Sequence, residues 1–100
     1  PVGVRLHAVY PHMHELGRSL RVSLARADGG ESCLLDVPRW DFDWQLLYDY
    51  RRPVVFGARD AVTLDCVYDT RGRTTTTTWG EGTADEMCLA FLYASLDLTL

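Results

Sequence analysis

Apolar and polar residues alternate along much of this chain, in short runs that are divided by turn-forming residues. In the run 18–24, Leu20, Val22 and Leu24 fall on one side of an extended backbone, while helical periodicity is weak throughout. The runs that we expect to form strands cover residues 2–10, 18–24, 32–37, 44–50, 54–56, 61–68, 74–79 and 87–96. About eight short strands with regularly spaced turns predict an all-β fold, an antiparallel β-sandwich of the jelly-roll type.

Two segments add local detail to this prediction. The stretch 28–31, Asp-Gly-Gly-Glu, is a turn signal and predicts a β-hairpin between the runs 18–24 and 32–37. The threonine run 74–78 is interpreted as a half-exposed strand, because β-branched residues suit a pleated surface.

The size and charge of the chain limit what it can do. Its 100 residues are enough for one small domain, residues 1–100, and a hydrophobic share of 47% allows a packed core. The net charge of −4 and the scattered arginines argue against a nucleic-acid partner, which would need clustered positive charge. No stretch reaches the roughly 20 apolar residues of a membrane span.

The composition also bears on the origin of the chain. It contains no Lys, Ile or Asn, residues that share AT-rich codons, so we expect a gene from a GC-rich genome and a bacterial source. The chain has no starting Met and no signal peptide. We therefore expect it to be a piece excised from a longer polypeptide.

The cysteines are Cys33, Cys66 and Cys88, an odd number that cannot be fully paired within the chain. One disulfide with one free or externally paired thiol is the simplest arrangement. The absence of a C-x-x-C motif argues against a zinc knuckle or a thioredoxin-like site.

The first candidate for chemistry is the segment His12-Met13-His14, which follows Pro11. Residues two apart in an extended chain point the same way, so the two imidazoles are expected to converge on one side, as a metal ion requires. A His-x-His pair alone is a weak signal, and two surface histidines are its alternative explanation.

The second candidate is Met87, which by itself would be interpreted as core filler. If the fold brings it to the histidine pair, two imidazoles and one soft thioether would favour one copper ion, Cu(I) in particular, over zinc, magnesium or calcium. Three protein ligands would leave an open coordination position, as reactive metal sites require.

The chain as a whole resembles the C-terminal domain of the copper type II, ascorbate-dependent monooxygenases, the family of dopamine β-monooxygenase and peptidylglycine α-hydroxylating monooxygenase. The stretches that carry this resemblance keep the order and approximate spacing of the family over most of the chain, and they are more specific together than singly. They are His12-Met13-His14-Glu15-Leu16-Gly17-Arg18, Phe42-Asp43-Trp44-Gln45, the run 53–60, Cys66-Val67-Tyr68-Asp69-Thr70 and Gly82-Thr83-Ala84-Asp85-Glu86-Met87-Cys88.

The resemblance implies roles for individual residues. His12, His14 and Met87 match copper ligands of the family, at the centre where O2 binds and the substrate is attacked. Cys66 and Cys88 match two cysteines that form a disulfide, which would brace the strand that carries Met87. If Met87 and Cys88 are neighbours in a strand they face opposite ways, so one can serve the metal and the other the bridge.

The resemblance also implies a parent protein that hydroxylates a C–H bond of a small molecule or peptide, using O2, copper and a one-electron donor such as ascorbate. Such a parent has an upstream domain with a second copper centre on three histidines, and it is extracytoplasmic, either periplasmic or secreted. This chain has three histidines in total. After His12 and His14 only His7 remains, so the second centre cannot be built here and the isolated domain is not expected to turn over.

The chain departs from the peptide-amidating members of the family in two places. They carry an Arg that binds the substrate carboxylate where this chain has Tyr10, and a Tyr where it has Phe91. These differences argue against a peptidylglycine substrate. The sequence identifies neither another substrate nor the reductant.

A function of another class fits the same residues: a stand-alone copper-binding, storage or transfer module without enzymatic activity. His7 is expected to be exposed or satisfied by a hydrogen bond, on the opposite strand face from His12 and His14, and Cys33 to be a small buried hydrophobe or a free thiol. The carboxylates Asp41, Asp43, Asp85 and Glu86 could suggest a paired acid/base site, but they are interpreted as solvated loop residues. The tryptophans Trp40, Trp44 and Trp79 could line a ligand surface, and core packing explains them at least as well.

Overall fold

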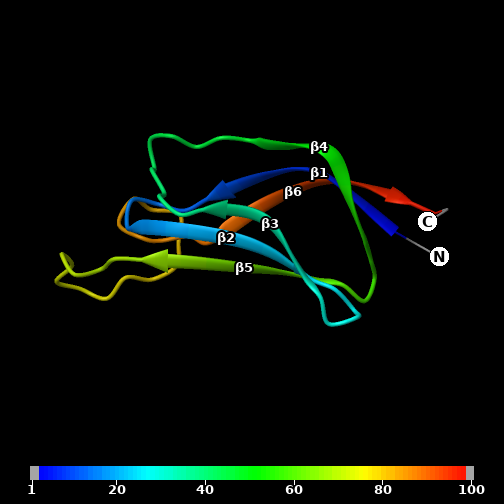
Figure 1. Cartoon of the computed structure of the whole chain (residues 1–100). Coiled ribbons are helices and arrows are strands. Elements are labelled where there is room, and N and C mark those ends of the chain that lie inside the picture. The colour runs from blue at the N-terminus through cyan, green and yellow to red at the C-terminus, as the bar shows by residue number, and fades with distance from the viewer. Residues whose placement is uncertain (1–2, 99–100) are drawn as a thin grey trace.

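The computed structural model describes residues 3–98, which form six β-strands and no helix. The strands are β1 (Gly3–His12), β2 (Gly17–Ala25), β3 (Glu31–Val37), β4 (Tyr48–Gly57), β5 (Ala61–Tyr68) and β6 (Leu89–Asp97). They form two antiparallel three-stranded sheets, in the orders β4-β1-β6 and β3-β2-β5 (Figure 1). The predicted all-β sandwich is confirmed, with six strands where about eight were expected. Between residues 3 and 98 there is no helix that could cross a membrane.

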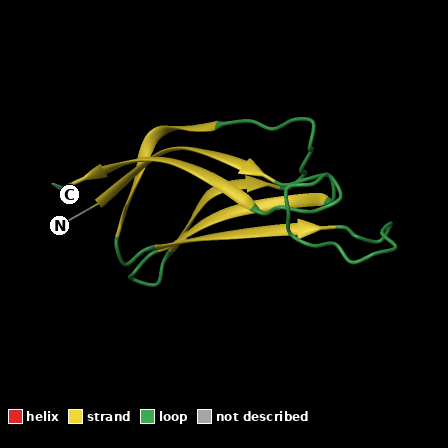
Figure 2. Cartoon of the chain, turned by 180° about the vertical axis from the view of Figure 1, so that it is seen from behind, coloured by secondary structure: helices red, strands yellow, loops and turns green. Residues whose placement is uncertain are grey.

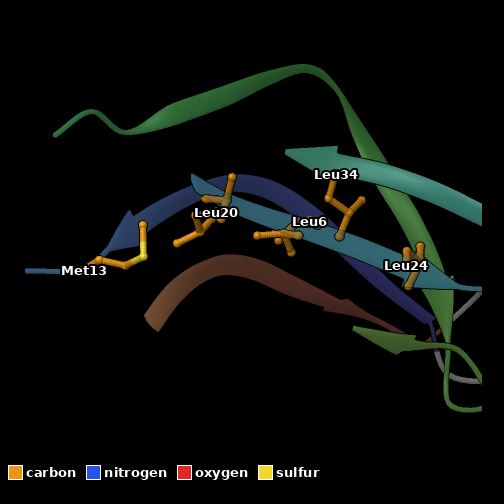
Figure 3. Packing of buried hydrophobic residues seen from close by; sticks show 7 residues of the cluster. Leu6, Met13, Leu20, Leu24 and Leu34 are labelled. Atoms are coloured by element: carbon orange, nitrogen blue, oxygen red, sulfur yellow. The ribbon is translucent and has the colours of Figure 1, made fainter. Parts of the chain in front are cut away.

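The core lies between the two sheets and is built from the side chains that alternate along their central strands. Leu6 on β1 and Leu20 and Leu24 on β2 are at most 1% exposed. Figure 3 shows these leucines with Leu34 between the sheets, and Met13 at the end of the row. Because burial of one such side chain stabilises the fold by about 1.5–3 kcal/mol, this row supplies much of the driving force for folding.

Strand β1 is irregular, and its irregularity decides which way the histidine segment faces. The pairing of β1 with both β4 and β6 shifts register between Leu6 and Ala8. A bulge of this kind changes the alternation, so that Val9 as well as Leu6 is fully buried. After Val9, the odd-numbered residues Pro11 and Met13 also face the core. His12 therefore lies on the opposite face of the strand. Val2, where the first predicted strand began, lies outside the described residues.

The predicted hairpin is confirmed as the antiparallel pair β2–β3. Gly29 sits in its turn with a φ of 94°, a backbone conformation that favours glycine because it has no Cβ. The side chain of Asp28 closes the turn by accepting a hydrogen bond from the Gly30 N–H at 2.8 Å.

Two strand predictions need correction. Residues 74–79 do not form a strand, and the one ladder contact of this stretch is an isolated bridge between Trp79 and Glu86. The threonines have β propensity but no alternating apolar residues to bury, so propensity alone did not produce a strand. The runs 44–50 and 54–56 prove to be one strand, β4, which begins at Tyr48 and passes through Pro53. Proline is tolerated there because β4 lies at the edge of its sheet.

The tryptophans do not share one environment. Trp40 packs against the buried cluster, as predicted. Trp44 and Trp79 are 71% and 63% exposed, so core packing, one of their two interpretations, is wrong for both. Both lie in loops outside the two sheets, where there is no opposing layer to cover them.

The connections between strands gather at two ends of the sandwich (Figure 2). One end, called here the histidine end, carries the β1–β2 turn and the long connections 38–47 and 69–88. The other, called the hairpin end, carries the β2–β3 and β4–β5 turns. The residues that could do chemistry lie at the histidine end.

Candidate metal centre

The histidine pair stands where β1 gives way to the turn that leads to β2. His12 is the last residue of the strand and half-buried, and His14 lies two residues beyond it and is 8% exposed. Between them Met13 is fully buried in the core, which anchors the segment and leaves the two imidazoles on its other side. The ring centroids are 5.2 Å apart and the ring planes are nearly perpendicular, at 80°. The expected convergence of the two rings is therefore present.

The turn after His14 is fixed by contacts to its backbone. The His14 carbonyl oxygen accepts hydrogen bonds from the indole N–H of Trp40 at 3.1 Å and from the Gly17 N–H at 3.3 Å. A Cβ on Gly17 would lie 2.8 Å from side-chain atoms of both Met13 and Trp40, so only glycine lets the chain pass this closely.

Hydrogen bonds at Nδ1 set the tautomer of both imidazoles. Nδ1 of His12 lies 2.7 Å from Oε1 of Gln45, whose amide nitrogen is already donating to the Phe42 carbonyl at 2.8 Å. Nδ1 of His14 lies 2.9 Å from the carbonyl oxygen of Asp85, which can only accept. Each Nδ1 therefore carries the hydrogen, and each Nε2 keeps the lone pair that a metal ion binds.

A cavity of about 160 Å³ opens beside the two rings. The ring of Phe42 meets that of His14 edge to face, with centroids 6.1 Å apart, and covers one side of it. The lining residues are His12, His14, Glu15, Phe42, Glu81 and Thr83.

Met87 does not line this cavity, but its backbone is tied to the same region. It is half-buried and lies just before β6, so the prediction that it opens a strand was wrong, and strand alternation does not separate it from Cys88. The hydroxyl of Tyr68 donates to its carbonyl oxygen. Burial, followed by the charge of Glu86, raises the pKa of Tyr68 to about 12, so this hydroxyl stays protonated and remains a donor at neutral pH.

Glu86 was interpreted as a solvated loop carboxylate, and that interpretation was wrong. It is 7% exposed, and its carboxylate accepts the backbone N–H groups of His14 at 2.9 Å, Leu16 at 2.8 Å and Met87 at 3.3 Å. Its partners His14 and Leu16, in the β1–β2 turn, are 72 and 70 residues away in the sequence, so no local sequence pattern could predict these bonds. Asp41 and Asp43, by contrast, are exposed as expected.

The disulfide is formed by Cys66 and Cys88, as the resemblance implied, with Cα atoms 5.9 Å apart. It ties the end of β5 to the segment that carries Met87, directly before β6. Cys33 is free and exposed, so of its two interpretations the free thiol is right and the buried hydrophobe is wrong.

His7 lies apart from the pair. It is exposed, and its Nε2 is 2.7 Å from Oγ of Ser95, so it is both exposed and hydrogen-bonded, as predicted. The regular strand assumed in assigning its face is interrupted by the bulge at this residue. Among residues 3–98, no three side chains of His, Cys, Asp or Glu are grouped so that they could hold a metal ion. Met87 carries a donor of another type, a thioether, and it directly follows Asp85 and Glu86, two residues that hydrogen-bond to His14.

Residues 1–98 match the family described as copper type II ascorbate-dependent monooxygenase, C-terminal domain. Tyramine beta-hydroxylase of Caenorhabditis briggsae is 37% identical over 94 residues, which are 91% of this chain and 16% of that protein. DBH-like monooxygenase protein 1 of Mus musculus is 30% identical over 101 residues, 99% of this chain and 16% of that protein. The chain thus spans about 16% of the length of these relatives. Both are animal proteins, and they give no support to the bacterial source expected from composition.

Proposed function

The chain belongs to the C-terminal domain family of the copper type II ascorbate-dependent monooxygenases, and we propose that it holds one copper ion through Nε2 of His12, Nε2 of His14 and the thioether of Met87. The observation that carries this proposal is the tautomer of the two neighbouring rings. Both Nδ1 atoms are hydrogen-bonded to oxygen, so both lone pairs are offered by Nε2. Two imidazoles and one thioether form a donor set that suits copper, and Cu(I) most of all.

Within the parent protein this centre is the place where O2 and substrate meet, and hydroxylation of a C–H bond is the reaction. Copper, when bound, would supply the one-electron chemistry that O2 requires. The residues of the chain orient and enclose: Gln45 and Asp85 hold the imidazoles, and Phe42 covers one side of His14. Ascorbate or another one-electron donor would serve as reductant.

The isolated domain is proposed to bind copper without turning over. A second copper centre on three histidines would have to come from an upstream domain, since His7 is the one histidine left and is bonded to Ser95. The greater length of the relatives leaves room for such a domain. The disulfide between Cys66 and Cys88 favours an extracytoplasmic location, in a periplasm or outside the cell.

The test is a competition between Cu(I) and Zn(II), followed by X-ray absorption at the copper edge. Cu(I) should displace zinc, and the spectrum should show one sulfur neighbour that disappears in Met87→Ile. The other methionine, Met13, is buried in the core, so Met13→Leu is the matched control and should keep the sulfur neighbour. Equal or tighter zinc binding would contradict Met87 as a ligand. Copper binding in a parent protein that never consumes O2 would favour the copper storage or transfer function instead.

A further inference from the structure

The β1–β6 ladder ends just short of the candidate centre. The last pair in its register is His12 with Leu89. Beyond that pair, the segment of His14 and the segment of Met87 separate from the sheet and need other contacts to hold their spacing. The disulfide joins Cys88 to Cys66 on β5, and so it does not itself link the Met87 segment to the histidine segment.

The side chain of Glu86 takes over where the ladder stops. One carboxylate oxygen, Oε1, accepts the N–H of His14 at 2.9 Å and the N–H of Met87 at 3.3 Å, and Oε2 accepts the N–H of Leu16 at 2.8 Å. A single oxygen atom thus bonds the backbone of one proposed ligand on each segment.

From this contact we infer that Glu86 is a positioning residue, which sets the spacing between Met87 and the two histidines. The inference rests on the proposed copper site. Glu86 itself does not touch the metal in this assignment, and it acts through the backbone of His14 and of Met87.

The surroundings of Glu86 keep it from relaxing to another position. Its own N–H donates to the Thr78 carbonyl at 3.0 Å, and its carbonyl accepts from the Gly80 N–H at 3.0 Å. The side chain is 7% exposed, and no ion pair formed within residues 3–98 includes it. A buried carboxylate with only N–H partners needs those partners, so the bonds and the burial support each other.

The chemistry of the group is specific to a carboxylate. Both oxygens must accept, because N–H groups lie against each of them. In Glu86→Gln one oxygen becomes an NH2 group, which would face an N–H donor whichever way the amide turns. Either the His14–Met87 side or the Leu16 side would then open.

The matched control lies at the hairpin end. Asp60 also accepts two backbone N–H groups, from Ala27 at 2.8 Å and from Gly57 at 3.0 Å, but none of its partners belongs to the candidate centre. Asp60→Asn therefore makes the same chemical change at the opposite end of the sandwich.

The experiment measures Cu(I) affinity and the sulfur neighbour of copper in the full chain, its Glu86→Gln variant and its Asp60→Asn variant. Glu86→Gln should weaken Cu(I) binding by about 10- to 100-fold and diminish the sulfur contribution, the range expected when a group that orients metal ligands is lost. Asp60→Asn should leave both at the parental values. Should Glu86→Gln not fold, Glu86→Asp keeps the charge, shortens the side chain and gives the same comparison.

The outcomes separate this inference from the proposed function. Parental Cu(I) affinity and an unchanged sulfur neighbour in the Glu86 variant would overturn the positioning role. Equal weakening in Glu86→Gln and Asp60→Asn would overturn it too, because the effect would then reflect stability alone. If copper bound to the unsubstituted chain has no sulfur neighbour, Met87 is not a ligand, and the proposed function is overturned with it.

Discussion

The two ends of this sandwich are each closed by a carboxylate that accepts backbone N–H groups, yet the two carboxylates work in different surroundings. At the hairpin end, Asp60 joins the β2–β3 turn to the β4–β5 turn and also lies 3.6 Å from the guanidinium of Arg26. At the histidine end, Glu86 joins three N–H groups, is almost completely buried and has no ion pair within the described range 3–98.

The difference shows what each end requires. At the hairpin end, the Asp60 carboxylate also pairs with Arg26, so its charge does not depend on the two backbone N–H groups alone. At the histidine end a buried charge is costly unless it is bonded, and it is retained where two segments far apart in sequence must meet. The Cys66–Cys88 disulfide lies at this same end. The disulfide and the Glu86 carboxylate therefore both hold the segment that precedes β6, beside the candidate centre.

Removing the disulfide, which lies at the histidine end, should have the largest effect on the free energy of unfolding. The bridged cysteines are 22 residues apart, and a loop of this length predicts a loss of about 3 kcal/mol in the double variant Cys66→Ala/Cys88→Ala. Urea unfolding measures it. The control is Cys33→Ala, which removes a free, exposed thiol and should change the free energy by less than about 0.5 kcal/mol. Equal stabilities of the two variants would show that the bridge does not brace the fold.

Truncating the two carboxylates compares the ends directly. Glu86→Ala leaves the buried N–H group of His14 and the partly buried N–H group of Leu16 without an acceptor, and should cost about 2 kcal/mol or more in the free energy of unfolding. Asp60→Ala should cost less, because the freed N–H groups of its two turns can be hydrated. Urea unfolding of both variants tests the order, and a larger loss for Asp60→Ala would reverse the comparison drawn here.

The sequence predicted the hairpin end better than the histidine end. Turn residues and the alternation of Leu20, Val22 and Leu24 are local signals, and they predicted β2, β3 and their hairpin. The bulge in β1 arises from its pairing with two other strands, so the run 2–10 did not show it. The threonine run 74–78 was predicted as a strand from its β propensity, but it has no apolar face that a sheet could bury, and it forms no strand.

For the candidate centre, prediction from the sequence was limited because the interacting residues lie far apart along the chain. The spacing of His12 and His14 predicts two neighbouring rings, and the structure has them. Their tautomers depend on Gln45 and on the Asp85 carbonyl, which come from loops 33 and 71 residues away. The role of Glu86 could not be predicted for the same reason, because its partners His14 and Leu16 are 72 and 70 residues away.

Changing the ligands themselves should alter copper binding far more than stability. His12→Ala and His14→Ala should each lose most of the affinity for Cu(I) and Cu(II), while the free energy of unfolding falls by only about 1 kcal/mol, the usual value of one hydrogen bond. We expect the sandwich core and the disulfide, rather than a metal ion, to hold the fold. His7→Ala is the control, since His7 is exposed and bonded to Ser95, and it should bind copper as the parent does. Copper titrations measure the affinity of the three variants, and thermal unfolding measures their stability. If the His12 and His14 variants bind copper as tightly as the unsubstituted chain, the assignment of the site is wrong.

The smallest expected effect is a pH dependence that belongs to the hairpin end. The backbone N–H groups of Gly57 and Ala27, with Arg26, hold the pKa of Asp60 below its usual 3.8. A carboxyl group whose pKa is lower in the folded state contributes stability above its unfolded pKa, and that contribution is lost as the pH falls through 3.8 toward the folded pKa. Asp60→Asn should therefore reduce the slope on the acid side of the stability curve and change it little near neutral pH, as measured by urea midpoints between about pH 2 and pH 6. Part of the acid slope should remain, because the hydrogen bonds from Arg71 lower the pKa of Asp69 as well. Asp36→Asn is the control, because Asp36 is an exposed carboxylate on β3 that lies 3.7 Å from Arg21 and has no backbone N–H partner among its bonds in the described region. If Asp60→Asn keeps the full acid dependence of the parent, the link between the two turns does not depend on the charge of Asp60, and hydrogen bonding by a neutral side chain is enough to close that end.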